Sequence, residues 1–195
     1  MRKVLTGFIG FLFLLAVTLI LADQNKDKKE QEGMLMEMPK PGPELKKLDF
    51  FVGNWMADVT MYPNEFMPGG KSQGKESMKW ELDGMFVSMD YQDQPGEEKK
   101  MLAYKGKGFM TYDMQKKTYR SWWMDNWGSA SESVGDWADD KTLVLSHQGE
   151  FMGKKFHEKF VYQILDQNKF HFQIEHSPDG KEFKKVMEAT YTRGK

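Results

Sequence analysis

Two histidines and a glutamate are the residues of this chain best placed to do chemistry together: His147, Glu158 and His176. With a hairpin turn at Met152-Gly153, His147 lies directly opposite Glu158, and the following strand brings His176 diagonal to Glu158. Such a trio could bind a divalent metal ion, exchange protons as acid and base, or hydrogen-bond the polar head of a ligand. The competing interpretation is a self-satisfied polar cluster, because buried polar groups normally find partners.

A second candidate group is Asp125 with Trp123, near the end of a predicted strand. The hairpin before it places the two residues opposite Gly106 and Gly108, and a glycine leaves room for an indole ring. Asp125 could then meet an interior cation such as Lys185, although carboxylates at strand ends are usually hydrated. Further candidates for a ligand-binding wall are Trp80, Phe160, Tyr162, Phe172 and Met187. For Trp80, Trp123 and Tyr162, packing in the core is the favoured interpretation.

Composition and charge exclude several classes of function. The chain has 28 basic and 29 acidic residues, so it lacks the basic field that nucleic-acid binding requires. It contains no cysteine, which excludes disulfides and lipidation at a cysteine. Neither a nucleophile motif nor a phosphate-binding glycine loop occurs in it. We therefore predict no enzymatic activity, no catalytic residue and no cofactor, and the trio is only a weak candidate for a metal site.

The strands that must position these residues follow from the spacing of apolar residues. From Trp55 onward, apolar and polar residues alternate with a period of two, which is typical of half-buried strands. Short turn sequences separate the runs, so nearly every connection is a hairpin. We predict an all-β fold, an antiparallel up-and-down β-barrel, because closing a meander removes its exposed edges; an open two-layer sheet is the alternative. The roughly ten predicted strands cover about residues 54–61, 73–82, 85–93, 99–112, 118–126, 129–137, 141–151, 154–166, 170–177 and 182–193.

Turn sequences also predict the register of the hairpins. An Asp-Gly turn at residues 83–84 sets Met78 against Met89 and leaves the polar residues on the other face. Later in the chain, an odd-numbered loop is needed to keep apolar residues on one face.

That loop, residues 167–169, sets Tyr162 against Ile174, and the Asp-Gly turn after it sets Phe172 against Met187. Successive hairpins therefore share one apolar face, which must turn toward the inside of the barrel.

Residues 1–22 have the layout of a secretory signal peptide, with a basic start, a long apolar run and the small residue Ala22 before the expected cut. The apolar run is also nearly long enough to be retained as a membrane anchor. Residues 23–42 form a charged flexible linker, and residues 43–195 form a single domain large enough for a core. We expect an exported protein, periplasmic or extracellular, that has no stable membrane span after cleavage.

A short predicted helix with Gly53-Asn54-Trp55 after it, and Arg193 at the end of the last strand, resemble the signature of the calycin superfamily, the lipocalins and their relatives. In that superfamily such a tryptophan closes one barrel end and an arginine packs across it. The resemblance implies that Gly53, Trp55 and Arg193 close the barrel and that the helix lies at that end.

More narrowly, the chain resembles an uncharacterised bacterial secreted family known as domain of unknown function 1579, over about residues 43–193. The residues that carry this match are Leu48, Gly53, Trp55, Leu82-Asp83-Gly84, Tyr112-Asp113, Lys117, Tyr119, Trp123, Asp125, Tyr191 and Arg193. The nitrobindin-like relatives bind haem through a histidine, but their glycine-rich segment after the first tryptophan is replaced here by Met56-Ala57-Asp58.

The first functional hypothesis is therefore a non-enzymatic binder of a lipid-like or other hydrophobic small molecule inside the barrel. One alternative is a metal-binding, haem-binding or enzymatic barrel that uses His147, Glu158 and His176. The other is a structural or interaction domain with a filled barrel and surface contacts at Phe86, Phe109 and Trp122. Fold alone does not decide among them, and the sequence predicts neither the ligand nor the oligomeric state.

Overall fold

The computed structural model describes residues 40–64, 69–94, 103–151 and 153–194. The chain divides into two compact units, Met1–Lys40 and Pro41–Lys195, and the second carries every helix and strand described below. The predicted signal peptide and nearly all of the predicted linker lie outside the described residues.

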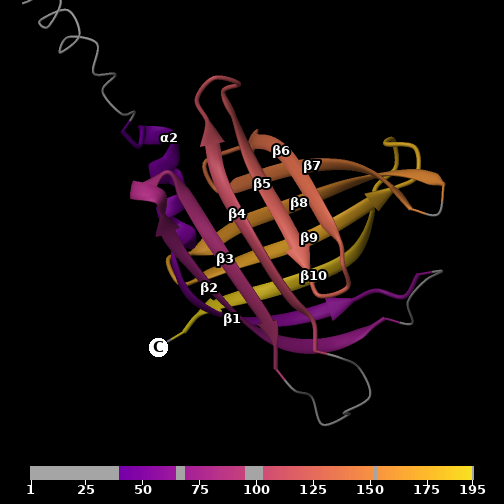
Figure 1. The fold of residues 1–195 in the computed structure, drawn as a ribbon. Coiled ribbons are helices and arrows are strands. Elements are labelled where there is room, and N and C mark those ends of the chain that lie inside the picture. Colours follow the sequence, from indigo (N-terminus) through magenta and orange to yellow (C-terminus); the bar gives the residue numbers. More distant parts are fainter. Residues whose placement is uncertain (1–39, 65–68, 95–102, 152, 195) are drawn as a thin grey trace, which may run out of the picture. The chain divides into compact units, whose positions relative to one another are not determined.

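Ten antiparallel strands form a closed barrel in which each strand pairs with its neighbours in sequence and β1 pairs with β10 (Figure 1). The prediction of an all-β antiparallel barrel is confirmed. The β1–β10 ladder joins the two ends of the domain and leaves no edge strand in the ring. The strands are β1 (Gly53–Met61), β2 (Gly70–Glu81), β3 (Phe86–Asp93), β4 (Lys105–Asp113), β5 (Thr118–Asp125), β6 (Ala130–Trp137), β7 (Thr142–Phe151), β8 (Lys154–Asp166), β9 (Lys169–Ser177) and β10 (Lys184–Arg193).

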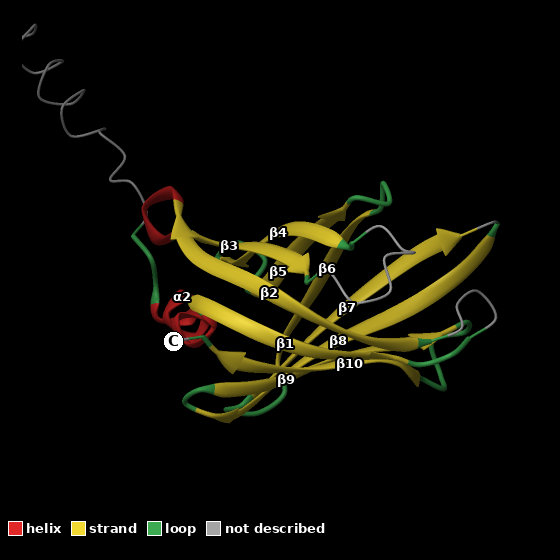
Figure 2. Ribbon diagram, turned by 90° about the horizontal axis from the view of Figure 1, so that it is seen from below, coloured by secondary structure: helices red, strands yellow, loops and turns green. Residues whose placement is uncertain are grey.

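Three short helical segments lie at one end of the barrel, called the helical end below (Figure 2). They are α2 (Pro43–Lys46), η1 (Lys47–Phe51) and η2 (Leu82–Gly84). Pro43 starts α2 at a position that needs no N–H donor. The opposite end, where β1 finishes and β2 begins, is called the far end. The short helix predicted before the first strand is therefore present at the closed end of the barrel.

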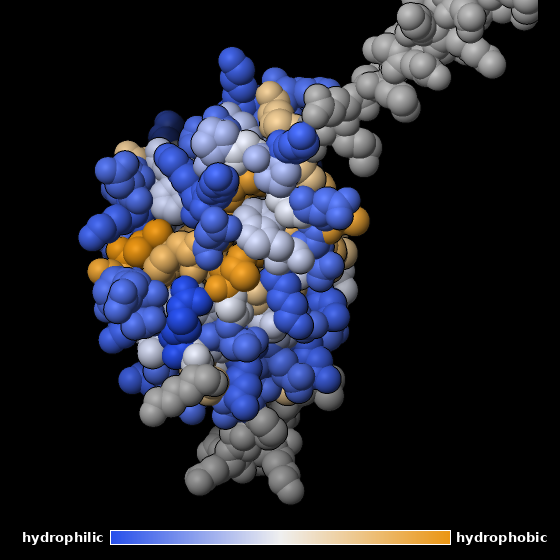
Figure 3. Space-filling view, turned by 90° about the vertical axis from the view of Figure 1, so that its left-hand side faces the viewer, coloured by the Kyte–Doolittle hydropathy of each residue, from blue (hydrophilic) through white to orange (hydrophobic). Residues whose placement is uncertain are grey.

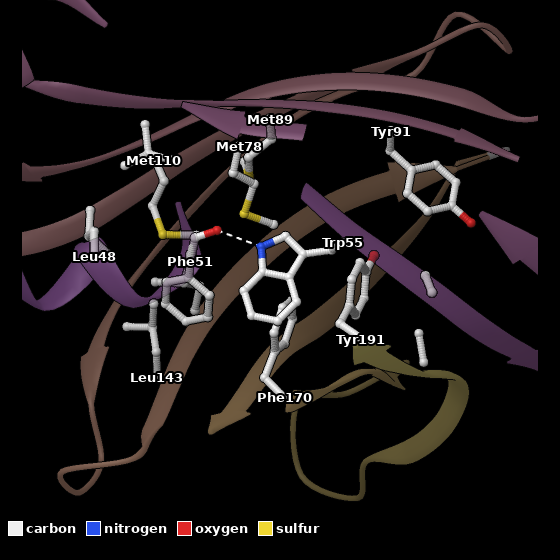
Figure 4. Close-up of a cluster of buried hydrophobic side chains, with 14 of the residues drawn as sticks. Leu48, Phe51, Trp55, Met78, Met89, Tyr91, Met110, Leu143, Phe170 and Tyr191 are labelled. Atoms are coloured by element: carbon white, nitrogen blue, oxygen red, sulfur yellow. Dashed lines mark hydrogen bonds between the residues drawn. The ribbon is translucent and has the colours of Figure 1, made fainter. Parts of the chain in front are cut away.

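The hydrophobic core fills the helical end. Leu45, Leu48 and Phe51 from the helical segments are buried against inward-facing strand residues (Figure 4). Trp55 is 1% exposed, and its Nε1 donates a 2.7 Å hydrogen bond to the Phe51 carbonyl oxygen. The Phe170 ring meets the Trp55 ring edge-on, with 4.8 Å between their centres. Burial of these large side chains makes the helical end a major source of the domain's stability.

The first hairpins have the predicted register. Met78 lies opposite Met89 in the β2–β3 ladder, and Gly108 lies opposite Trp123 in the β4–β5 ladder. The β2–β3 turn works because Asp83 and Gly84 both take positive φ angles, 58° and 81°, which suit a tight hairpin. The described part of β4 begins later than predicted, at Lys105.

In the last two hairpins the apolar residues from Met187 onward and on β8 and β9 keep their predicted faces, but the predicted pairing was wrong by two residues. Tyr162 lies opposite Phe172 rather than Ile174, and Phe172 lies opposite Ala189 rather than Met187. In the β8–β9 hairpin the extra residue is a bulge between Ile164 and Asp166 of β8, not part of the loop. In the β9–β10 hairpin the predicted two-residue turn is replaced by a longer connection, which sets His176 against Lys184, and by a bulge between Lys185 and Met187. A bulge and an odd-numbered loop leave the same side chains facing inward. They differ only in which residue of the partner strand each residue pairs with.

The outer face carries some apolar residues. Figure 3 shows one face on which apolar residues gather between hydrophilic ones. On the outside of β3 to β5, the Phe86 ring lies 6.5 Å from the Phe109 ring and 6.4 Å from the Trp122 ring. Within the described residues, no helix is long and apolar enough to cross a membrane.

Candidate functional site

Arg193 holds the helical end closed. It lies opposite Trp55 in the β1–β10 ladder, with its guanidinium carbon 4.2 Å from the centre of the Trp55 ring. Its two Nη atoms each donate a 2.8 Å hydrogen bond, to the carbonyl oxygens of Val52 and Phe50. Gly53 has a φ of 141°, and a Cβ added there would lie 2.5 Å from Arg193 Nη1. These contacts tie the helical segment to the last strand and place no ligand at this end.

His147, Glu158 and His176 come together from β7, β8 and β9. The shifted register brings His176 directly opposite Glu158 instead of diagonal to it, so both histidines flank the carboxyl. His176 Nδ1 lies 3.8 Å from Glu158 Oε1, and these two side chains are 38% and 25% exposed. Phe156 packs between the histidines, with ring centres 5.9 Å from His147 and 5.4 Å from His176. The trio is therefore a half-buried polar cluster around an aromatic ring.

The hydrogen bonding of His147 limits what the trio can do. His147 Nδ1 lies 2.7 Å from the carbonyl oxygen of Glu132. Because a carbonyl only accepts, Nδ1 must carry the proton, and Nε2 of the neutral ring is the acceptor. Burial raises the pKa of Glu158, and the two histidines oppose that rise. Among the described residues, no three His, Asp or Glu side chains are placed to share a metal ion. The arrangement suits hydrogen bonding to a polar group.

Asp125 and Trp123 belong to a polar network near the far end. Trp123 Nε1 donates a 2.7 Å hydrogen bond to the Tyr104 hydroxyl, which lies 3.4 Å from Asp125 Oδ2. The other Asp125 oxygen accepts hydrogen bonds of 2.9 and 3.0 Å from loop N–H groups. The Trp123 ring covers Gly106, where a Cβ would overlap it. Asp125 therefore stabilises the β5–β6 loop as well as facing the interior.

Lys185 does not join this network. The bulge in β10 places it opposite Glu175 on the outer face, and its Nζ lies 2.7 Å from Glu188 Oε2. The expectation that Lys185 faces the interior was wrong, because the bulge changes which side of β10 that residue occupies.

Four of the five apolar wall candidates line the interior together. The Tyr162 and Phe172 rings pack with centres 4.7 Å apart, and Phe160 and Met187 both lie opposite Ile174. Trp80 lies apart from them. Its Nε1 donates a 2.8 Å hydrogen bond to the carboxylate of Asp49 in η1, at the helical end.

The interior also holds a carboxyl that the sequence pattern did not single out, Glu76 of β2. It lies between Trp55 and Tyr91 in the two ladders and is 5% exposed. Burial raises its pKa to about 7, and a hydrogen bond with the Tyr191 hydroxyl opposes the rise. The alternation of faces along β2 could have identified it from the sequence, since Glu76 lies on the same strand face as the buried Met78.

The family of the chain follows from a match over most of its length. A family model described as "Protein of unknown function (DUF1579)" matches residues 40–193. The chain belongs to this family. The resemblance stated from the sequence is thereby confirmed, and the family's description assigns no activity. A search of curated proteins found no match to the chain.

Solved structures share the barrel at low sequence identity. Rv2717c from M. tuberculosis is 11% identical with a TM-score of 0.58, and the match covers 79% of this chain and 99% of that chain. The S-type phycobiliprotein lyase CPES from Guillardia theta is 10% identical with a TM-score of 0.50, and the match covers 80% of this chain and 99% of that one. At these identities the likeness shows a shared fold and does not transfer an activity.

Proposed function

We propose that the barrel binds a hydrophobic small molecule in its interior and admits it from the far end. The observation that carries the proposal is the partial exposure of apolar side chains that face inward. Phe156, Phe160 and Tyr162 of β8 and Phe172 and Ile174 of β9 all point into the ring, yet each is partly exposed. An inward-facing side chain of a closed barrel meets solvent only where the interior is not filled. A concave apolar wall with few polar groups is the usual form of a small-molecule site.

The trio supplies polar contacts for such a molecule. His147, Glu158 and His176 lie on the same strands as the aromatic wall, closer to the far end. A ligand whose body lies against Phe160 and Phe172 would place a polar group within reach of the trio. Since a carboxyl flanked by two imidazoles can both donate and accept hydrogen bonds, the trio would orient the ligand rather than react with it.

Titration with the neutral apolar dye Nile red tests this proposal. Wild-type protein is expected to bind the dye with a blue-shifted, enhanced emission that saturates at one dye per chain. The substitution Ile174→Trp fills the interior between Phe160 and Met187, so it should abolish the saturable signal. The matched control is Gln173→Trp, one residue away on the outer face of β9, which should leave it unchanged. Equal binding by both variants would refute an interior site.

Native mass spectrometry of protein purified from its own host gives an independent measurement. A bound hydrophobic molecule should appear as added mass that is lost on denaturation. Its identity would then be read from the released compound.

We also propose that the chain is exported, with cleavage after Ala22, on the strength of the charge and hydropathy pattern of residues 1–22. The N-terminus of the protein isolated from its host should then be Asp23. A chain that keeps Met1 and sediments with membranes would instead indicate a retained anchor.

A further inference from the structure

Between the two ends of the barrel, the described charged side chains that face the interior are carboxyls, apart from the two histidines of the trio. Cations of the same strand faces lie at the ends: Arg193 stacks on Trp55 at the helical end, and Lys154 and Lys184 lie at the far end. Four carboxyls face inward, from β2, β3, β5 and β8: Glu76, Asp93, Asp125 and Glu158. Within the described residues, Lys and Arg form their ion pairs on the outer face, with Asp90, Asp113, Glu132 and Glu188. An anionic ligand would therefore meet like charge inside the barrel, whereas a cation would meet opposite charge.

Glu76 is the most buried of these carboxyls, and its hydrogen bond with Tyr191 offers it no positive charge. The residue is 5% exposed and faces the interior between Trp55 and Tyr91. A buried carboxylate is costly unless a positive group lies close to it. Burial accordingly raises the pKa of Glu76 to about 7. The described chain thus offers Glu76 a neutral hydroxyl, and below about pH 7 its own proton neutralises it; at neutral pH, where the ionised form is populated, a cationic group of a ligand would be its counter-charge.

Aromatic rings surround Glu76. Tyr91 is its direct neighbour on β3, and Tyr191 comes from β10; Figure 4 shows both rings beyond the Trp55 indole. The Tyr91 hydroxyl occupies the space that a Cβ of Gly74 would take, and it donates a 2.8 Å hydrogen bond to Asp93. Faces of aromatic rings attract ammonium groups, most strongly where water is excluded.

We propose that Glu76, with the rings of Tyr91 and Tyr191, forms the inner end of the ligand site and selects molecules that carry an ammonium group on an apolar body. The inference rests on the proposed function, because the interior must first admit a ligand. An alcohol of the same shape would leave Glu76 without a counter-charge, and a carboxylate would add a like charge beside it.

Competition among three ligands with the same apolar chain tests the inference without any variant. Octylamine, octanol and octanoate are each titrated against the complex of wild-type protein with Nile red at neutral pH. Octylamine is expected to displace the dye at a concentration about tenfold below that of octanol, with octanoate the weakest, because charge complementarity gives selectivity between partners of one shape.

Two variants locate the selectivity. Glu76→Gln is expected to keep Nile red binding and to reduce the advantage of octylamine over octanol to about twofold or less. Glu175→Gln, on the outer face of β9, removes a carboxylate that cannot reach the interior and should keep the full advantage. Circular dichroism checks that each variant is folded. If Glu76→Gln does not fold, the order in which the three ligands displace Nile red from the wild-type protein is the test.

Amine selectivity and interior binding can fail separately in these experiments. If Nile red binds inside the wild-type barrel but octanoate competes as well as octylamine, the amine selectivity is overturned and the proposed function stands. The same holds if Glu76→Gln keeps the full preference for octylamine. If Nile red does not bind in the interior, the proposed function itself fails.

Discussion

At the scale of single residues, Gly53 and Arg193 are matched to each other. Gly53 has a positive φ of 141°, and any side chain there would meet the Arg193 guanidinium, which is held by two carbonyl oxygens and the Trp55 ring. The substitution Gly53→Ala should therefore strain the backbone and displace Arg193. Together these effects should lower the free energy of unfolding by roughly 2 to 4 kcal/mol. Urea denaturation followed by tryptophan fluorescence measures it.

A double-mutant cycle separates the two causes. In an Arg193→Ala background the clash is gone, so Gly53→Ala should cost less there, by about 1 kcal/mol or more. Equal costs in the two backgrounds would mean that Arg193 plays no part in the requirement for glycine.

The buried carboxyl of Glu76 should make the stability of the domain depend on pH. Burial raises its pKa from 4.5 to about 7, so between these values the folded state holds a proton that the unfolded state has released. Stability from this group is therefore greatest below pH 4.5 and falls as pH rises to about 7, by about 3 kcal/mol in total. Glu76→Gln should remove that fall. The variant's stability relative to wild type should rise from pH 5 to pH 8.

The other ionisable groups around Glu76 do not produce the same effect. Tyr91, Tyr162 and Tyr191 face it from β3, β8 and β10, and burial raises the pKa of each above its usual value near 10. They stay protonated throughout this pH range, and Asp90 acts on Glu76 from the outer face. A wild-type and a Glu76→Gln curve that run parallel from pH 5 to pH 8 would rule out a buried, protonated Glu76.

At the scale of elements, hairpins were predictable and bulges were not. Turn residues and face parity placed the β2–β3 and β7–β8 ladders in the right register, because a one-residue slip would turn the apolar side chains outward. Parity does not distinguish an odd loop from an even loop with a bulge. The β8–β9 register was therefore two residues off, and His176 was placed diagonal to Glu158 rather than opposite it. The β9–β10 register was also two residues off, because the connection is longer than the predicted Asp-Gly turn and β10 contains a bulge.

The joint between α2 and the strands is also testable at this scale. The Tyr119 hydroxyl of β5 donates a 2.9 Å hydrogen bond to the carbonyl oxygen of Glu44 in α2. Tyr119→Phe keeps the ring and removes this bond, which should lower the free energy of unfolding by about 1 kcal/mol. Tyr112→Phe, on the neighbouring strand with its ring 5.0 Å away, leaves the bond in place and serves as the control. Equal losses would show that the bond does not fasten α2.

At the scale of the whole molecule, the candidate site depends on closure of the ring. The trio was predictable because its members lie on consecutive hairpins. Glu76 was not, because its burial depends on β1 pairing with β10, which brings Tyr191 beside a strand more than a hundred positions earlier in the chain. A hydrophobic pattern along one strand shows which face is inward, but it does not show which inward residues another part of the ring covers.

Closure also predicts how a bound ligand affects unfolding. In a barrel whose strands form a single ring, opening any ladder exposes the interior, so a molecule held there binds the folded state and not the unfolded one. Nile red at a hundred times its dissociation constant should then stabilise the domain by about 2.7 kcal/mol and raise the unfolding midpoint by roughly 5 to 10 °C. Differential scanning fluorimetry on tryptophan emission measures the shift. Ile174→Trp should show no shift and Gln173→Trp the full one, because only the first substitution occupies the interior. A shift of the same size in both variants would place the dye on the outer surface, and the interior would then have no demonstrated ligand.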